Sequence, residues 1–183
     1  DADELATMPR AGDISARAHA RAMRMARPGV REFEVEAALL HEFRKAGSQA
    51  PAYTSIVASG ANACVLHYVS NEATLKDGDL LLIDAGCELD GYASDITRTF
   101  PVNGKFSGPQ KAVYELVLAA QAAAIAEVKP GKRWNEPHDA AVKVLAQGML
   151  DLKLLTGSLQ EVLEKETYRQ DRKSTRLNSS HRT

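Results

Sequence analysis

The chain has 183 residues, of which 44% are hydrophobic and 26% are charged, and its formal net charge is -1. The length suits one domain with a sizeable core, and the balanced charge gives no basis for binding nucleic acid or an anionic membrane surface. No apolar run approaches the ~20 residues that a membrane helix needs, so we expect no membrane partner.

Five segments have the apolar spacing and the flanking residues of helices. They are residues 13–27, 31–46, 110–128, 135–150 and 158–166. Pro28-Gly29 separates the first helix from the second, and Pro130-Gly131 separates the third from the fourth. This repeated order indicates a duplicated unit, in which a further sheet segment would follow the second helix pair as one follows the first. We expect that second sheet segment to be missing from this sequence. We interpret Trp134, just after the second break, as a packing anchor at a helix start.

Short β-branched and apolar segments follow the first helix pair. We expect strands at residues 53–59, 64–69, 80–86 and 92–100. The run Leu-Leu-Leu-Ile-Asp-Ala-Gly at 80–86 is typical of a fully buried central strand. Asp90-Gly91 predicts a hairpin turn, after which residues 92–100 return as the antiparallel partner.

Two aspartates, Asp84 and Asp95, lie on either side of this turn. A carboxylate at the end of an apolar strand must be paired or must coordinate a cation, because burying an unpaired charge is costly. The hairpin register allows both side chains to converge, and converging carboxylates repel unless a cation such as Mn²⁺, Mg²⁺ or Ca²⁺ lies between them. On spacing alone, an alternative is equally good: Asp84 caps the following turn and Asp95 is solvated.

Residues 56–106 closely resemble the middle of the bacterial aminopeptidase P family of pita-bread metallopeptidases (family M24), which also include methionine aminopeptidase and creatinase. The likeness runs from about Arg10 to about Arg169 and includes, in order, RPG, HEF, LHY and DGDLLLIDAG. It implies an α+β pita-bread fold: a curved, mostly antiparallel sheet with helices on its outer face, truncated in its second half. It also implies an Xaa-Pro aminopeptidase, an enzyme that cleaves the bond before a penultimate proline. General aminopeptidases handle that bond poorly, because proline has no amide hydrogen and a fixed φ.

The resemblance assigns roles to three residues. Asp84 matches the first metal ligand, Asp95 matches an aspartate that bridges two ions, and His67 matches an active-site histidine that helps to polarise the scissile carbonyl. Two divalent ions, with Mn²⁺ the expected metal, would lower the pKa of the attacking water and stabilise the oxyanion. The family completes this site with a His and two Glu after Arg169. We do not find them here, and His181 lacks the Gly-rich context to replace the His, so we expect the chain by itself to be inactive.

The Ser- and Arg-rich residues 171–183 are interpreted as a non-native or disordered tail after a partial catalytic domain at residues 1–170. The expected partner is a peptide with a penultimate proline, and assembly as a homo-oligomer is left open. Cys64 and Cys87 lack zinc or disulfide spacing, and no secretory signal is visible, so we expect a cytoplasmic protein. The alternatives are another M24 enzyme, such as methionine aminopeptidase, or a non-catalytic pita-bread module that binds peptides or proteins.

Overall fold

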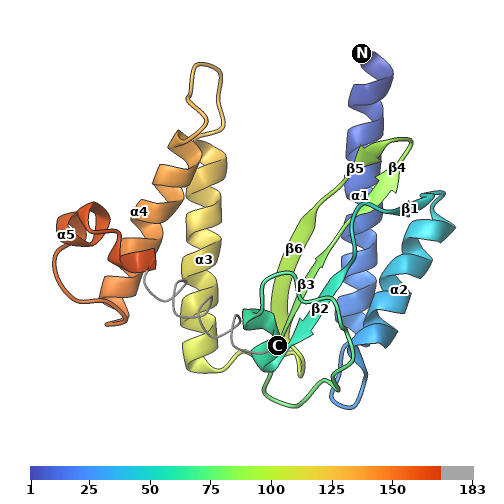
Figure 1. Ribbon diagram of the computed structural model, residues 1–183, viewed down its shortest axis with the longest axis horizontal. Helices are drawn as coiled ribbons and strands as arrows, with labels where there is room; N and C mark the ends of the chain where they lie inside the picture. The colour runs from blue at the N-terminus through green and yellow to red at the C-terminus, as the bar shows by residue number, and fades with distance from the viewer. Residues whose placement is uncertain (170–183) are drawn as a thin grey trace, which may run out of the picture. The chain divides into compact units, whose positions relative to one another are not determined.

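The computed structural model describes residues 1–169, and the chain divides into two compact units, Asp1–Phe106 and Ser107–Thr183 (Figure 1). The first unit contains α1 (Ala2–Met25), α2 (Glu32–Lys45), β1 (Ala50–Pro51), β2 (Ile56–Ser59), η1 (Gly60–Cys64), β3 (Leu80–Ala85), β4 (Cys87–Leu89), β5 (Tyr92–Ala93) and β6 (Ile96–Pro101). The second contains α3 (Gly108–Ala126), α4 (Glu136–Asp151), α5 (Leu159–Glu164) and η2 (Thr167–Arg169). The predicted tail at 171–183 lies outside the described residues.

All five predicted helices are present, but the first begins much earlier than expected. Asp1 caps α1, because its side chain accepts hydrogen bonds from the backbone amides of Asp3 and Glu4. The helix continues through Pro9, which the prediction treated as lying outside it. Among the described residues, no helix combines the length and apolar character needed to cross a membrane.

The larger sheet of the first unit has the strand order β2-β3-β6, and both pairings are antiparallel. The central place of β3 is therefore confirmed. Its predicted full burial is wrong: Leu81, Ile83 and Ala85 are buried, whereas the alternate residues Leu80 and Leu82 are only half-buried. One face of β3 is thus packed under helices, as the period of two along a strand requires.

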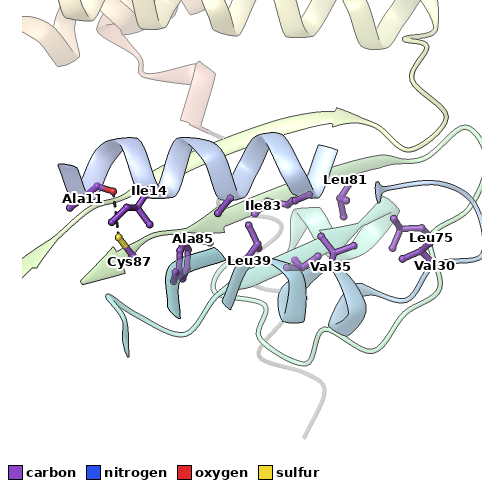
Figure 2. Packing of buried hydrophobic residues seen from close by; sticks show 14 of the residues in the cluster. Ala11, Ile14, Val30, Val35, Leu39, Leu75, Leu81, Ile83, Ala85 and Cys87 are labelled. Carbon is purple, nitrogen blue, oxygen red and sulfur yellow. Dashed lines mark hydrogen bonds between the residues drawn. The ribbon is translucent and has the colours of Figure 1, made fainter. Parts of the chain in front are cut away.

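The hydrophobic core of the first unit lies between this sheet and the helices α1 and α2. Figure 2 shows Ile14 of α1, Val35 and Leu39 of α2, and Ile83 of β3 gathered in this layer. Leu39 and Ile83 are 0% exposed. Burying a side chain of this size contributes about 1.5–3 kcal/mol. The apolar spacing of the two helices therefore serves to cover one face of the sheet.

The Asp90-Gly91 turn is confirmed, although it closes a smaller hairpin than predicted. Leu89 pairs directly with Tyr92, which makes Asp90-Gly91 a two-residue loop between β4 and β5. Both turn residues have positive φ, 51° and 84°, which favours Asn, Asp and Gly at these positions. The small sheet β1-β4-β5 therefore lies between β3 and β6 in the chain, while β3 and β6 still pair with each other.

The predicted strand at residues 64–69 is wrong. Residues 60–64 form the short helix η1, and the following loop contains His67 and Asn71 with φ of 54° and 49°. Extended backbone excludes such values. This loop finds its hydrogen-bond partners in side chains from other elements, so β-branched composition alone gave the wrong structure here.

In the second unit, α3 and α4 pack closely against each other. Gly148 of α4 makes this contact tight, because a Cβ there would lie 2.1 Å from Leu116 Cδ1 of α3. The interpretation of Trp134 as a packing anchor is wrong: its side chain is 99% exposed in the connection between the two helices.

Candidate functional site

Asp84 and Asp95 meet at one end of the larger sheet, around the hydroxyl group of Tyr53. Tyr53 Oη lies 2.6 Å from Asp84 Oδ1 and 3.0 Å from Asp95 Oδ1. Asp84 is half-buried in β3, and Asp95 is exposed just before β6. The structure therefore brings the two predicted carboxylates together, while their role as metal ligands stays a prediction.

The two aspartates are not cross-strand neighbours. They converge because the β3–β6 pairing ends before it reaches Asp95. Asp84 pairs with Thr97, so Asp95 lies beyond the last residue pair of the β3–β6 ladder. Ser94 is held from the helix side, because its Oγ lies 2.7 Å from Ser15 Oγ of α1. This contact fixes the backbone immediately before Asp95.

Gly86 permits the close approach of the segments that carry the tyrosine and the carboxylates. A Cβ at Gly86 would lie 1.7 Å from Ser94 O and 3.1 Å from Asp95 N, both backbone atoms. On the other side, Gly86 O accepts a hydrogen bond of 2.9 Å from Ala52 N, next to Tyr53. Only a residue without a side chain allows these three segments to meet at this point.

Tyr53 is the hydrogen-bond donor shared by the two carboxylates, and its ionisation is shifted by them. Burial, together with the hydrogen bonds to Asp84 and Asp95, raises the pKa of the phenol well above its usual range. Tyr53 thus remains a neutral donor at physiological pH. A phenol has one proton, which serves two carboxylates here, so negative charge at this site is only partly compensated.

His67 lies on a separate loop that follows η1. Its side chain is exposed and, within the described residues, it forms no hydrogen bond with Asp84 or Asp95. The structure therefore places His67 on the surface and does not join it to the carboxylate pair. Its predicted role toward a substrate stays a prediction.

Two residues of the site were missed by sequence reasoning. Tyr53 opened a predicted strand, and no local pattern distinguishes it from other strand tyrosines. Gly86 had a usable signal, since a glycine at the end of an apolar strand often marks a close backbone approach.

The donor set fits part of a site for a hard divalent cation. Carboxylate oxygens are the ligands that Mn²⁺ and Mg²⁺ prefer. Within residues 1–169, however, no group of three or more His, Cys, Asp or Glu side chains is placed to hold a metal ion. The described residues thus supply two converging carboxylates and a neutral donor that orients them.

Comparisons with known proteins identify one family of relatives. The model of metallopeptidase family M24 matches residues 6–175. An Xaa-Pro aminopeptidase of Haemophilus influenzae is 49% identical over 168 residues, which are 92% of this chain and 39% of that protein. The solved structure of Pseudomonas aeruginosa aminopeptidase PepP is 56% identical with a TM-score of 0.91, over 92% of this chain and 38% of that one. A zinc-substituted Escherichia coli aminopeptidase P in complex with product is 44% identical with a TM-score of 0.90, over the same shares.

The chain thus spans about two fifths of the length of the relatives that it matches. The close structural match confirms the predicted α+β pita-bread fold, with helices on one face of an antiparallel sheet. Because the family model covers nearly all of the sequence, the chain belongs to metallopeptidase family M24.

Proposed function

We propose that Asp84 and Asp95 are ligands of a dinuclear divalent-metal site, with Mn²⁺ as the metal, and that His67 contacts a peptide substrate. The whole protein would then hydrolyse the bond between an N-terminal residue and a penultimate proline. The observation that carries this proposal is the convergence of both carboxylates on the single hydroxyl of Tyr53. The alternative in which Asp84 only caps a turn does not explain that convergence.

The electrostatic repulsion between Asp84 and Asp95 supports the binding of a cation at this site. Two carboxylates that share one hydroxyl proton repel each other, and a divalent ion removes this repulsion while it binds. The names of the relatives point the same way, since one is a zinc-substituted aminopeptidase in complex with product. When bound, divalent ions supply Lewis acidity and lower the pKa of water.

The residues of the chain itself have distinct tasks in this proposal. Tyr53 keeps its proton and holds Asp84 in a fixed orientation through a hydrogen bond to Oδ1. The remaining lone pairs of the Asp84 carboxylate then point away from Tyr53. Gly86 keeps the segment before β6 close enough for Asp95 to join. His67, exposed on its loop, offers ring nitrogens that can donate a hydrogen bond to a substrate carbonyl.

The metal part of the proposal is tested by titrating Mn²⁺ into the 183-residue chain by calorimetry and by electron paramagnetic resonance. Two carboxylates give a weak site, so we expect a dissociation constant on the order of 10⁻⁴–10⁻³ M. Asp84→Asn and Asp95→Asn are expected to abolish binding. The matched control is Asp90→Asn, because Asp90 is exposed in a turn where Asn is equally suitable. Binding that survives both site variants, or no binding by the unmodified chain, would reject the assignment.

The substrate part is tested with the full-length gene product. Peptides with proline as the second residue are compared with matched peptides that have alanine there, in the presence of Mn²⁺. Selective release of the first residue before proline supports the proposal. Equal cleavage of both peptides would favour another M24 aminopeptidase, and binding without cleavage would favour the non-catalytic module.

A further inference from the structure

Glu32, in the first turn of α2, is a fully buried carboxylate whose hydrogen-bond donors all come from residues 59–73. Its side chain is 0% exposed. Oε1 accepts from Ser59 N at 2.8 Å, Ser59 Oγ at 2.7 Å and Asn62 Nδ2 at 3.2 Å. Oε2 accepts from Tyr68 Oη at 2.7 Å and Ala73 N at 2.9 Å. Neutral donors therefore surround a buried charge that has no cation in contact among the described residues.

These five bonds connect the beginning, the middle and the end of one loop. Ser59 ends β2, Asn62 lies in η1, Tyr68 directly follows His67, and Ala73 begins the return of the chain toward α2. Asn62 Nδ2 also lies 3.1 Å from Tyr68 Oη, which links the two sides of the loop beneath its tip. The Glu32 carboxylate thus accepts hydrogen bonds from this segment in the way that a neighbouring strand would.

Apolar packing does not provide an alternative anchor at the tip of the loop. Val65, Leu66 and Val69 are 50%, 73% and 50% exposed, and His67 between them is exposed as well. His67 also has φ of 54°, in the left-handed region that residues other than glycine adopt infrequently. The polar contacts of Asn62 and Tyr68 are therefore the candidates for holding this conformation.

A second anchor acts only on the far end of the loop. Asn71 is buried, accepts a hydrogen bond from Val57 N at 2.9 Å and donates one to Ser55 O at 2.9 Å. Its side chain fixes the return of the loop beside β2 through these two bonds, which involve residues of the β2 segment. The bond from Tyr68 to Glu32 is therefore made by the residue that directly follows His67.

We propose that Glu32 is a positioning residue that sets the place of His67, by holding Asn62 and Tyr68 on a common buried carboxylate. The proposal deepens the proposed function, on which it rests for the role of His67 toward substrate. The buried Glu32 carboxylate holds the loop through neutral hydrogen-bond donors. The imidazole of His67 stays exposed at the surface.

The first test uses backbone ¹⁵N relaxation of the 183-residue chain and needs no catalytic activity. Tyr68→Phe removes one hydroxyl donor to Glu32, and Tyr92→Phe is the matched control because Tyr92 Oη donates to Glu4 on the surface. We expect the order parameters of Leu66 and His67 to fall from about 0.85 to below about 0.6 in Tyr68→Phe, with β3 unchanged. Glu32→Gln is expected to act more strongly than its control Glu36→Gln on the same helix. If Glu32→Gln does not fold, Tyr68→Phe and Asn62→Ala carry the test. Unchanged order parameters at Leu66 and His67 would overturn the proposal.

The second test is a double-mutant cycle on peptide hydrolysis by the full-length gene product. If Glu32 acts through His67, Tyr68→Phe lowers kcat in the unmodified enzyme but has little further effect in a His67→Ala background. Equal fold losses in both backgrounds would indicate general destabilisation and overturn the positioning role. An unaffected His67→Ala enzyme would instead refute the proposed role of His67, while the relaxation experiment would still decide whether Glu32 orders the loop.

Discussion

Replacing Gly86 by alanine is expected to damage both the stability of the first unit and the convergence of the carboxylates. The new Cβ would lie 1.7 Å from Ser94 O, 2.5 Å from Ser94 C and 3.1 Å from Asp95 N. An ordinary contact between Cβ and a backbone oxygen needs a separation above 3 Å, so the backbone at Ser94 would have to move by more than 1 Å. No flexible side chain is available to absorb this shift, because all three neighbours are backbone atoms.

The size of the effect follows from the geometry. Overpacking typically costs about 1–3 kcal/mol, and a backbone clash this close belongs at or above the upper end. A loss of about 3 kcal/mol in a unit of this size lowers the melting temperature by on the order of 10–20 °C. The shift would also carry Asp95 away from Asp84, so Mn²⁺ binding should be lost even in the fraction that remains folded.

Gly12→Ala provides a control of opposite sign. Gly12 lies within α1, and a Cβ there would meet no atom within 4 Å. Alanine in a helix interior is favoured over glycine by roughly 0.5–1 kcal/mol, so this variant should melt slightly higher than the unmodified chain. Thermal unfolding followed by circular dichroism compares the two variants directly. If Gly86→Ala melts within about 2 °C of the unmodified chain, the argument from close approach is refuted.

Two further predictions concern the core and the site. Leu39→Ala should lower the free energy of unfolding, measured by urea titration, by about 2–5 kcal/mol, because Leu39 is fully buried. The control Leu5→Ala, at a position that is 70% exposed, should change it by less than about 0.5 kcal/mol. Similar losses in both variants would contradict the described core. Because the pKa of Tyr53 is raised in the folded state, its contribution to stability is complete below the unfolded pKa and declines as pH rises above about 10. Tyr53→Phe should therefore leave unchanged the tyrosinate absorbance that develops in the folded chain between about pH 9 and pH 11. A measurable loss of that absorbance would show that Tyr53 titrates normally.

Local patterns in the sequence determined most of the elements of this fold. Helical spacing and the Pro-Gly breaks gave the helices, because both features act within a few residues of one another. The run at 80–86 gave the central strand β3, and Asp90-Gly91 gave a hairpin, because a two-residue loop with positive φ admits few residue types. Local chain reversal also allowed Asp84 and Asp95 to converge, although Asp84 pairs with Thr97 and Asp95 lies outside the β3–β6 ladder.

The tertiary structure decided the features that depend on contacts between distant segments. Residues 64–69 are not a strand, because the partners of this loop include Glu32, more than 25 residues earlier in the chain. Tyr53 is the common hydrogen-bond partner of Asp84 and Asp95 because β2, which follows it, pairs with β3. No periodic pattern in the sequence predicts such a contact. The sequence by itself determined which segments form helices and strands, since short-range sterics and apolar spacing govern that choice. Which side chains share a hydroxyl proton or surround a buried charge was decided only by packing, because that depends on where distant segments are brought together.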